Sequence, residues 1–178
     1  PGTMLTAGIR AAYREGVGKF SNVPGVKLVS AAEAGEGAAG AALFATDVDT
    51  FLASSTLMEE VFGPSTLVVE CATAGRMLAA AARLEGQLTA TIHASPDEFE
   101  ANRELVEVLA TKAGRLLFGG FPTGVEVAHA MTHGGPYPAT SDGRSTSVGT
   151  RAIDRFQRPV TYQNFPDAAL PPELQEAN

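Results

Sequence analysis

The feature that most constrains the fold is a regular alternation of strand and helix signals that begins at residue 65. A run rich in β-branched residues over 65–70 follows a Gly-Pro pair and predicts a strand. Apolar residues at helical spacing over 73–84, and then an alternating run over 88–93, predict a helix and a second strand. This order of elements is typical of α/β proteins.

A helix-start signature continues the alternation. Ser95 can cap a helix, Pro96 suits its first position, and Glu98 stands three residues after the serine, as in a capping box. The apolar face that follows ends at Gly114, and a fourth short strand is predicted over 115–118. Strands separated by single helices pair in parallel through right-handed crossovers. The predicted fold class is therefore α/β, an open, mainly parallel sheet with helices on both faces, in which functional residues are expected at the carboxyl ends of the strands.

Weaker patterns flank this central region. They predict a helix over 5–19, irregular structure over 21–40 with at most one brief strand, an extended run over 41–51, helical segments around 125–131 and 148–155, and a strand over 156–163. The last strand contains Pro159, which cannot donate to a ladder. We therefore expect that strand at a sheet edge, or paired with the edge of a partner subunit.

Charge and cysteine content exclude several classes of protein. The 178 residues carry 13 basic and 20 acidic side chains, and a net charge of −7 is unsuited to binding a phosphate backbone, so nucleic acid is excluded as a partner. No apolar run approaches the ~18 residues of a membrane span. The single cysteine rules out an internal disulfide and favours a reducing compartment, so we expect a cytoplasmic protein.

Glycines and histidines give only weak signals of chemistry. The glycine-rich run over 35–40 matches a dinucleotide fingerprint by letter, but it lacks a preceding strand and a following helix and carries Glu36, which favours an ordinary loop. His129 and His133 are four residues apart, without the glutamate or third ligand that a metal site needs, so no metal is predicted. A lone histidine such as His93, at a strand end, is best explained by a local hydrogen bond.

Cys71 is a candidate nucleophile because it follows a strand and precedes a helix by about two residues, a position that can lower a thiol pKa. The neighbouring Glu70 disfavours the thiolate. The sequence therefore favours a small, half-buried structural residue at this position.

The segment 59–64, Glu-Glu-Val-Phe-Gly-Pro, is more informative. Adjacent carboxylates in an extended segment point in different directions, so one can accept hydrogen bonds from hydroxyls while the other faces solvent. Phe62 lies two residues beyond Glu60 and therefore on the same side. A diol acceptor beside a flat apolar surface suits half of a nucleotide site; an exposed turn is the alternative.

This segment resembles a hallmark of the aldehyde dehydrogenase superfamily. Further stretches resemble the branch that contains the bacterial α-ketoglutaric semialdehyde (2,5-dioxovalerate) dehydrogenases and NADP-dependent fatty aldehyde dehydrogenases. These stretches are 84–93, 112–118, 121–127, 133–142, 144–150 and 158–163.

The resemblance implies roles for three residues. In the family the second glutamate of the segment holds the nicotinamide ribose hydroxyls and the phenylalanine packs near the nicotinamide ring, which implies that Glu60 and Phe62 bind NADP or NAD. Tyr137 matches loosely an aromatic that borders the aldehyde pocket, although Pro138 and Ala139 stand where two glycines are common.

The resemblance also implies that the chain is a C-terminal portion of such an enzyme. The nucleophilic cysteine and the general-base glutamate of the family lie upstream of every matched stretch, so this segment is expected to hold no catalytic residue and to be inactive alone. Residues 1–155 are expected to form part of the catalytic domain, and residues 156–178 an oligomerisation strand and tail of a homodimer or homotetramer.

The expected function is therefore oxidation of an aldehyde, in particular a semialdehyde, to a carboxylic acid by the intact oxidoreductase. Two alternatives stay open at this point. One is a stand-alone oligomerisation or interaction module, and the other is a related thiol-dependent reductase of acyl phosphates or thioesters.

Overall fold

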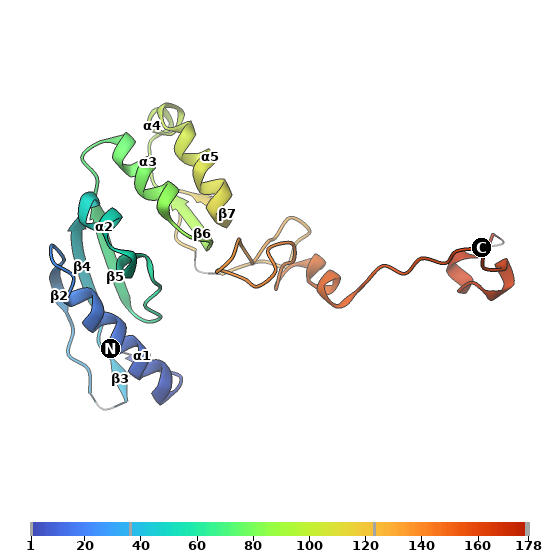
Figure 1. The fold of residues 1–178 in the computed structure, drawn as a ribbon, viewed down its shortest axis with the longest axis horizontal. Helices are drawn as coiled ribbons and strands as arrows, with labels where there is room; N and C mark the ends of the chain where they lie inside the picture. The colour runs from blue at the N-terminus through green and yellow to red at the C-terminus, as the bar shows by residue number, and fades with distance from the viewer. Residues whose placement is uncertain (1, 36, 123, 177–178) are drawn as a thin grey trace.

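The structure is a computed structural model that describes residues 2–35, 37–122 and 124–176. Glu36 of the glycine-rich run and Thr123 of the stretch 121–127 lie outside the described residues. Helices and strands occupy the chain up to residue 118, and the segment that follows leads away from them as loops, short 3-10 turns and an extended stretch (Figure 1). No helix in the described part of the chain is long and apolar enough to cross a membrane.

A three-stranded sheet and its covering helix form the N-terminal part. The strand order is β2-β4-β5, with β2 antiparallel and β5 parallel to the central β4. A two-residue ladder joins β1 to β3 beside it. The elements are β1 (Gly2–Thr3), α1 (Ala7–Ser21), β2 (Lys27–Ala31), β3 (Ala38–Ala39), β4 (Ala42–Asp47), α2 (Val48–Ala53), a 3-10 turn (Ser55–Met58) and β5 (Ser65–Glu70).

A second, two-stranded sheet follows, in which β6 and β7 pair in parallel. Helices α3 and α5 pack against each other beside it. The elements are α3 (Ala74–Arg83), β6 (Gln87–Ile92), α4 (Pro96–Ala101), α5 (Arg103–Lys112) and β7 (Ala113–Phe118). Beyond them lie 3-10 turns at Thr150–Phe156, Asp167–Ala169 and Pro172–Leu174.

The predicted α/β class is confirmed, and β6 and β7 pair in parallel through helices as expected. The pairing expected between β5 and β6 is not formed; β5 pairs in parallel with β4 instead, through α2 and a 3-10 turn. The single open sheet is not formed by the described residues, which give separate sheets and an antiparallel β2. Antiparallel pairing of β2 with β4 fits the short connection between them, residues 32–41, which holds no helix among its described residues, because a parallel pair needs a longer crossover.

Two predicted elements, one extended run and one helix, differ in the structure. The extended run predicted over 41–51 ends at Asp47, whose carboxylate accepts a hydrogen bond from Thr50 N at 2.8 Å and so starts α2. The helix predicted from Ser95 to Gly114 is divided into α4 and α5 at Asn102, whose side-chain amide donates to Glu98 O at 2.7 Å. A side chain that binds the carbonyl four residues earlier competes with the helical main chain.

Two segments in the C-terminal part differ from the elements predicted for them within a single chain. Residues 125–131 are irregular, because the Ala128 carbonyl accepts bonds from Met131 N and Thr150 N, which closes a turn. Residues 156–163 form no strand in this chain: Phe156 ends a 3-10 turn and the rest of the range has no secondary structure. A strand needs a partner, and these exposed residues have no neighbouring strand among the described residues.

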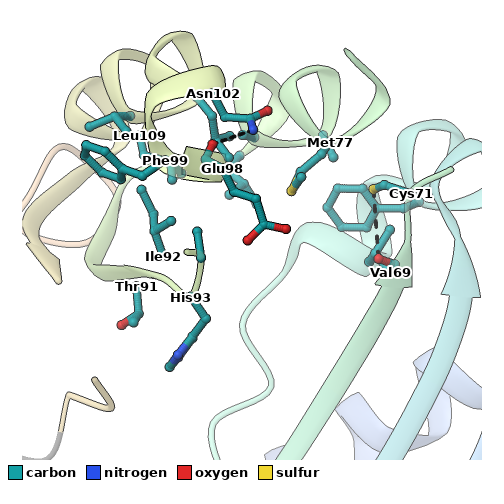
Figure 2. Close-up of a pocket in the computed structure, with 17 residues that line it drawn as sticks. Val69, Cys71, Met77, Thr91, Ile92, His93, Glu98, Phe99, Asn102 and Leu109 are labelled. Carbon is teal, nitrogen blue, oxygen red and sulfur yellow. Dashed lines mark hydrogen bonds between the residues drawn. The ribbon is translucent and has the colours of Figure 1, made fainter. Parts of the chain in front are cut away.

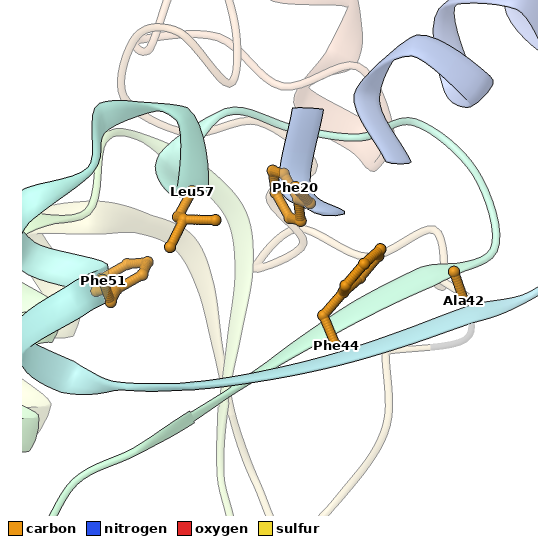
Figure 3. Close-up of a cluster of buried hydrophobic side chains, with 5 residues drawn as sticks. All are labelled: Phe20, Ala42, Phe44, Phe51 and Leu57. Atoms are coloured by element: carbon orange, nitrogen blue, oxygen red, sulfur yellow. The ribbon is translucent and has the colours of Figure 1, made fainter. Parts of the chain in front are cut away.

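The hydrophobic core lies between α1, β4 and the segment after it. Phe44 is 0% exposed and meets the ring of Phe20 edge to face, with centroids 5.7 Å apart. Figure 3 shows Phe51 and Leu57 reaching this cluster from α2 and the following turn, and Ala42 at the start of β4. This core fixes α1 against the sheet near the segment 59–64.

The capping box predicted at the start of α4 is present. Glu98 Oε2 accepts hydrogen bonds from Ser95 N and Ser95 Oγ, both at 2.8 Å, and Ser95 Oγ accepts from Glu98 N at 3.3 Å. The bonds from the Ser95 backbone and hydroxyl lower the pKa of Glu98. The ionised form of Glu98 is thus favoured by folding.

The stability of the protein against unfolding should therefore depend on pH through Glu98. Because the folded pKa of Glu98 is lowered, its stabilising effect is complete above the unfolded value of about 4.3 and is lost as the pH falls through the folded pKa. We expect thermal unfolding midpoints, measured by circular dichroism from neutral to acid pH, to fall less steeply in Glu98→Gln than in the unmodified protein. Asp97→Gln is the matched control, and an equal slope in Glu98→Gln and the unmodified protein would contradict this assignment.

Candidate functional site

The candidate site is a groove of about 670 Å³ between the N-terminus and the loop that enters β5. We call residues 59–64 the 59–64 loop. Glu60 and Phe62 both line the groove, so the structure brings together the two residues predicted to bind cofactor. The other lining residues come from residues 3–9, from the core, from the 59–64 loop and from β5: Thr3, Met4, Leu5, Ile9, Phe20, Leu57, Glu59, Val61, Gly63, Ser65, Thr66 and Leu67.

The 59–64 loop is held by helix α1. Tyr13 is 4% exposed, and its hydroxyl lies 2.6 Å from Gly40 O and 3.3 Å from Pro64 O. Gly63 lies against the Tyr13 ring so closely that a Cβ there would overlap the ring carbons. One turn further along α1, a Cβ on Gly16 would come 2.9 Å from Val61 Cγ1. The helix therefore packs directly on the main chain of the loop.

The chemistry of the groove is that of a polar acceptor beside an apolar surface. Glu60 is exposed, and the ring of Phe62 is 66% exposed. Glu59 lies near Lys19: a hydrogen bond to Glu15, together with the charges of Glu15 and Glu59, raises the pKa of Lys19. The exposed Glu60 carboxylate is open to hydroxyl donors.

Tyr137 does not share this groove. Its ring is 83% exposed, and it lines a separate hollow of about 390 Å³ beside the end of α3 and residues Glu85 and Gly86. Gly86 lies against the carbonyls of Pro136 and Tyr137, which places the Tyr137 loop at the start of β6. The 59–64 loop likewise precedes its strand, so these candidates lie at the amino ends of β5 and β6 and not at the predicted carboxyl ends.

The carboxyl ends of β5 and β6 border another pocket, of about 460 Å³, which contains Cys71 (Figure 2). Burial raises the pKa of the Cys71 thiol, and its Sγ lies 3.9 Å from Val69 O. The Glu98 carboxylate projects toward this pocket but already accepts the capping-box bonds. The neutral thiol and the paired carboxylate make this pocket poorly suited to nucleophilic chemistry.

The three histidines contact different residues. His129 and His133 do not share a helix; His129 Nδ1 lies 2.9 Å from Thr150 Oγ1, and His133 N donates to Thr146 Oγ1 at 2.8 Å. The ring of His93 lies 5.1 Å from that of Phe121. Within the described ranges, no three His, Cys, Asp or Glu side chains gather as a metal site would require.

Sequence patterns missed the contribution of Tyr13. The helix predicted over 5–19 contains Tyr13, but the spacing of apolar residues gives no role to its hydroxyl. The signal was available in part, since a tyrosine followed three residues later by Gly16 on one helix face marks a place where main chain can approach closely. Its partner could not be found from local sequence, because Pro64 O lies 51 residues away.

Adding a methyl group at Gly63 tests the contact between the loop and α1. Gly63→Ala should lower the free energy of unfolding by about 1–3 kcal/mol, because the new Cβ must push the loop off the Tyr13 ring. Urea unfolding followed by circular dichroism measures the change. Gly18→Ala is the control. Gly18 lies in α1, the helix of Tyr13, and an added Cβ there would have nothing within 4 Å, so the free energy of unfolding should stay equal or rise. Equal stability of Gly63→Ala and Gly18→Ala would show that the loop does not rest on Tyr13.

Comparison with curated proteins gives two relatives along the whole chain. The chain is 51% identical over 179 residues to alpha-ketoglutaric semialdehyde dehydrogenase 2 of Azospirillum brasilense, covering 99% of this chain and 34% of that protein. It is 45% identical over 181 residues to alpha-ketoglutaric semialdehyde dehydrogenase of Acinetobacter baylyi, covering 100% of this chain and 34% of that protein. The chain thus spans about one third of the length of these relatives. No protein-family model matches it.

Solved structures show the same fold at lower identity. A double mutant of betaine aldehyde dehydrogenase from Staphylococcus aureus, in complex with NAD+, matches with a TM-score of 0.66 and 16% identity over 87% of this chain and 30% of that chain. Proline utilization A from Bdellovibrio bacteriovorus matches with a TM-score of 0.67 and 22% identity over 89% of this chain and 16% of that chain. The resemblance predicted from the sequence motifs is confirmed: the chain is related to the aldehyde dehydrogenases and corresponds to about one third of the length of its curated relatives.

Proposed function

We propose that this chain is part of an NAD(P)-dependent aldehyde dehydrogenase that oxidises a semialdehyde, such as α-ketoglutaric semialdehyde, to the carboxylic acid. The observation that carries the proposal is that Glu60 and Phe62, from the motif typical of the family, line one groove in a chain 51% identical to an enzyme of that name. The NAD+ held by the structurally similar betaine aldehyde dehydrogenase supports the same cofactor class.

The residues of the groove fit the nicotinamide half of such a cofactor. The exposed Glu60 carboxylate can accept hydrogen bonds from two neighbouring ribose hydroxyls, since a carboxylate offers two oxygens. The exposed ring of Phe62 offers an apolar surface against which a flat ring can pack. The bound cofactor would supply the hydride acceptor, and these two side chains would fix the position and orientation of its ring.

We propose that the catalytic groups lie outside this chain. The neutral, half-buried Cys71 thiol does not suit the nucleophile, which must be a thiolate to attack an aldehyde. A cysteine and a base from the rest of the protein would form and hydrolyse the thioester, with water as the source of the second carboxylate oxygen. The exposed ring of Tyr137 would border the aldehyde from the side of β6.

We also propose that residues 1–155 are part of the catalytic domain and residues 156–178 an assembly segment. Phe156, at the end of the 3-10 turn Thr150–Phe156, is 78% exposed, and the exposed apolar side chains of Val160, Tyr162 and Phe165 follow it. An extended segment with exposed apolar groups suits pairing with the sheet edge of another subunit, as in a homodimer or homotetramer. The cytoplasmic location stays a prediction from the single cysteine.

The 178-residue chain should form no reduced cofactor from a semialdehyde with NADP or NAD, because it holds neither nucleophile nor base. The intact protein should form it under the same conditions, followed by the absorbance of the reduced nicotinamide. Turnover by the 178-residue chain would contradict the proposed placement of the catalytic groups. An intact protein that lacks turnover with any aldehyde would contradict the proposed function.

In the intact protein, Glu60→Gln should raise the KM for NADP or NAD about 10-fold or more, because a neutral amide replaces a charged acceptor of ribose hydroxyls. Steady-state kinetics with varied cofactor at saturating aldehyde measures the change. Glu70→Gln is the matched control, since Glu70 is exposed at the far end of β5 and does not line the groove, and it should leave that KM unchanged. Equal effects of the two substitutions would show that Glu60 does not contact the ribose.

A further inference from the structure

The site of the proposed function depends on a loop whose conformation is set from helix α1. We propose that Tyr13 is a positioning residue for cofactor binding: its hydroxyl and ring hold the 59–64 loop so that Glu60 and Phe62 present their side chains to the groove. This inference rests on the proposed function, because it concerns the same two cofactor contacts.

The Tyr13 hydroxyl lies where two strands begin. It donates to Gly40 O at 2.6 Å, two residues before β4, and approaches Pro64 O at 3.3 Å, one residue before β5. Pro64 O also accepts from Ala42 N at 3.0 Å, so a single short network ties α1, the entry to β4 and the end of the loop together. Burial raises the pKa of Tyr13, so the hydroxyl stays protonated and remains a donor at physiological pH.

The ring of Tyr13 supports the same loop by packing. Gly63 lies directly against the ring, and Val61 fills the space that the missing side chain of Gly16 leaves on α1. Val61 stands between Glu60 and Phe62, so its contact with α1 restricts where the main chain can place those two neighbouring residues. Tyr13 itself does not line the groove, so it acts through the loop and not on the ligand.

Both hydrogen bonds and contacts with α1 hold the loop. Glu59 N donates to Thr56 O at 3.3 Å, Ser65 N donates to Gly63 O at 2.8 Å, and Ser65 Oγ donates to Val61 O at 3.4 Å. The contacts of Val61 and Gly63 with α1 support the same two residues from the side of the helix. A loop fixed before the ligand arrives binds more tightly than one that must be ordered on binding, so loosening the Tyr13 contact should weaken cofactor binding.

Tyr13→Phe in the intact protein tests the inference, because it removes the hydroxyl and keeps the supporting ring. We expect the KM for NADP or NAD to rise about 3- to 10-fold, the range for loss of one buried hydrogen bond. The KM for aldehyde, and kcat at saturating cofactor, should change less than twofold. An unchanged cofactor KM, or parallel losses in all three parameters, would overturn the inference.

Thr46→Val is the matched control. Thr46 of β4 is buried, and its Oγ1 donates to Gly25 O at 3.0 Å. Like Tyr13→Phe, this substitution removes one buried hydrogen bond from a hydroxyl to a carbonyl, but it does so away from the 59–64 loop. It should lower the unfolding midpoint as Tyr13→Phe does and leave the cofactor KM unchanged. If Thr46→Val raised the cofactor KM as much as Tyr13→Phe does, a general loss of stability would explain both results and the inference would be overturned.

A double-mutant cycle with Glu60→Gln separates this inference from the proposed function. If Glu60→Gln leaves the cofactor KM unchanged, the proposed role of Glu60 fails, and the inference fails with it. If Glu60→Gln raises the KM, Tyr13→Phe should raise it less in the Glu60→Gln background than in the unmodified protein, because the contact it positions is already lost. Fully additive effects would leave the proposed function intact and overturn the role of Tyr13.

Discussion

The parallel pairing of β4 with β5 is the constraint on which the N-terminal part depends. Ala42 lies opposite Ser65 and the register runs without a break to Asp47 opposite Glu70. Pairing in this register brings the residues that enter the two strands, Gly40 and Pro64, side by side. Their carbonyls then lie within reach of one hydroxyl, that of Tyr13, although the residues are 27 and 51 positions from it.

The core makes this arrangement rigid. Phe44 points from β4 toward Phe20 of α1, and Phe51 and Leu57 close the cluster from the connection between β4 and β5. The connection must cross back along the sheet because parallel strands cannot be joined by a tight turn. The 59–64 loop is the last part of that crossing, so its conformation follows from the strand register, from the core and from α1.

Local sequence predicted the elements with strong local causes. The strand over 65–70 agrees in its bounds because β-branched residues and a Gly-Pro pair define it, and the capping box at Ser95 forms because its partners are three residues apart. Asp47 shows the limit: its carboxylate caps α2, whereas the alternating run alone indicated a continuing strand. The irregular 125–131 segment depends on Thr150, which no local pattern contains.

In the candidate site, too, sequence predicted the residues that lie close together along the chain and missed those that meet through long-range contacts. Glu60 and Phe62 could be paired from sequence because they alternate along one extended segment, and the structure places both on one groove. The role of Tyr13 could not be predicted from sequence, because the two carbonyls that its hydroxyl contacts come together only after β4 and β5 have paired. The Tyr137 loop is positioned by close main-chain contacts with Gly86 across a long sequence interval, and the segment 156–163 forms no strand within a single chain.

There is also a physical reason why these candidate residues lie at the amino ends of the strands. In open α/β sheets, ligands bind by rule at the carboxyl ends of strands, where helix starts and loops converge. Here the pocket at the carboxyl ends of β5 and β6 offers a neutral thiol and a carboxylate that is already bound to its own helix cap. At the amino end of β5, the exposed Glu60 and Phe62 stand on a loop held against a helix. Exposed polar groups on a rigid support are what a recognition site requires, and in this chain the strand entries provide them.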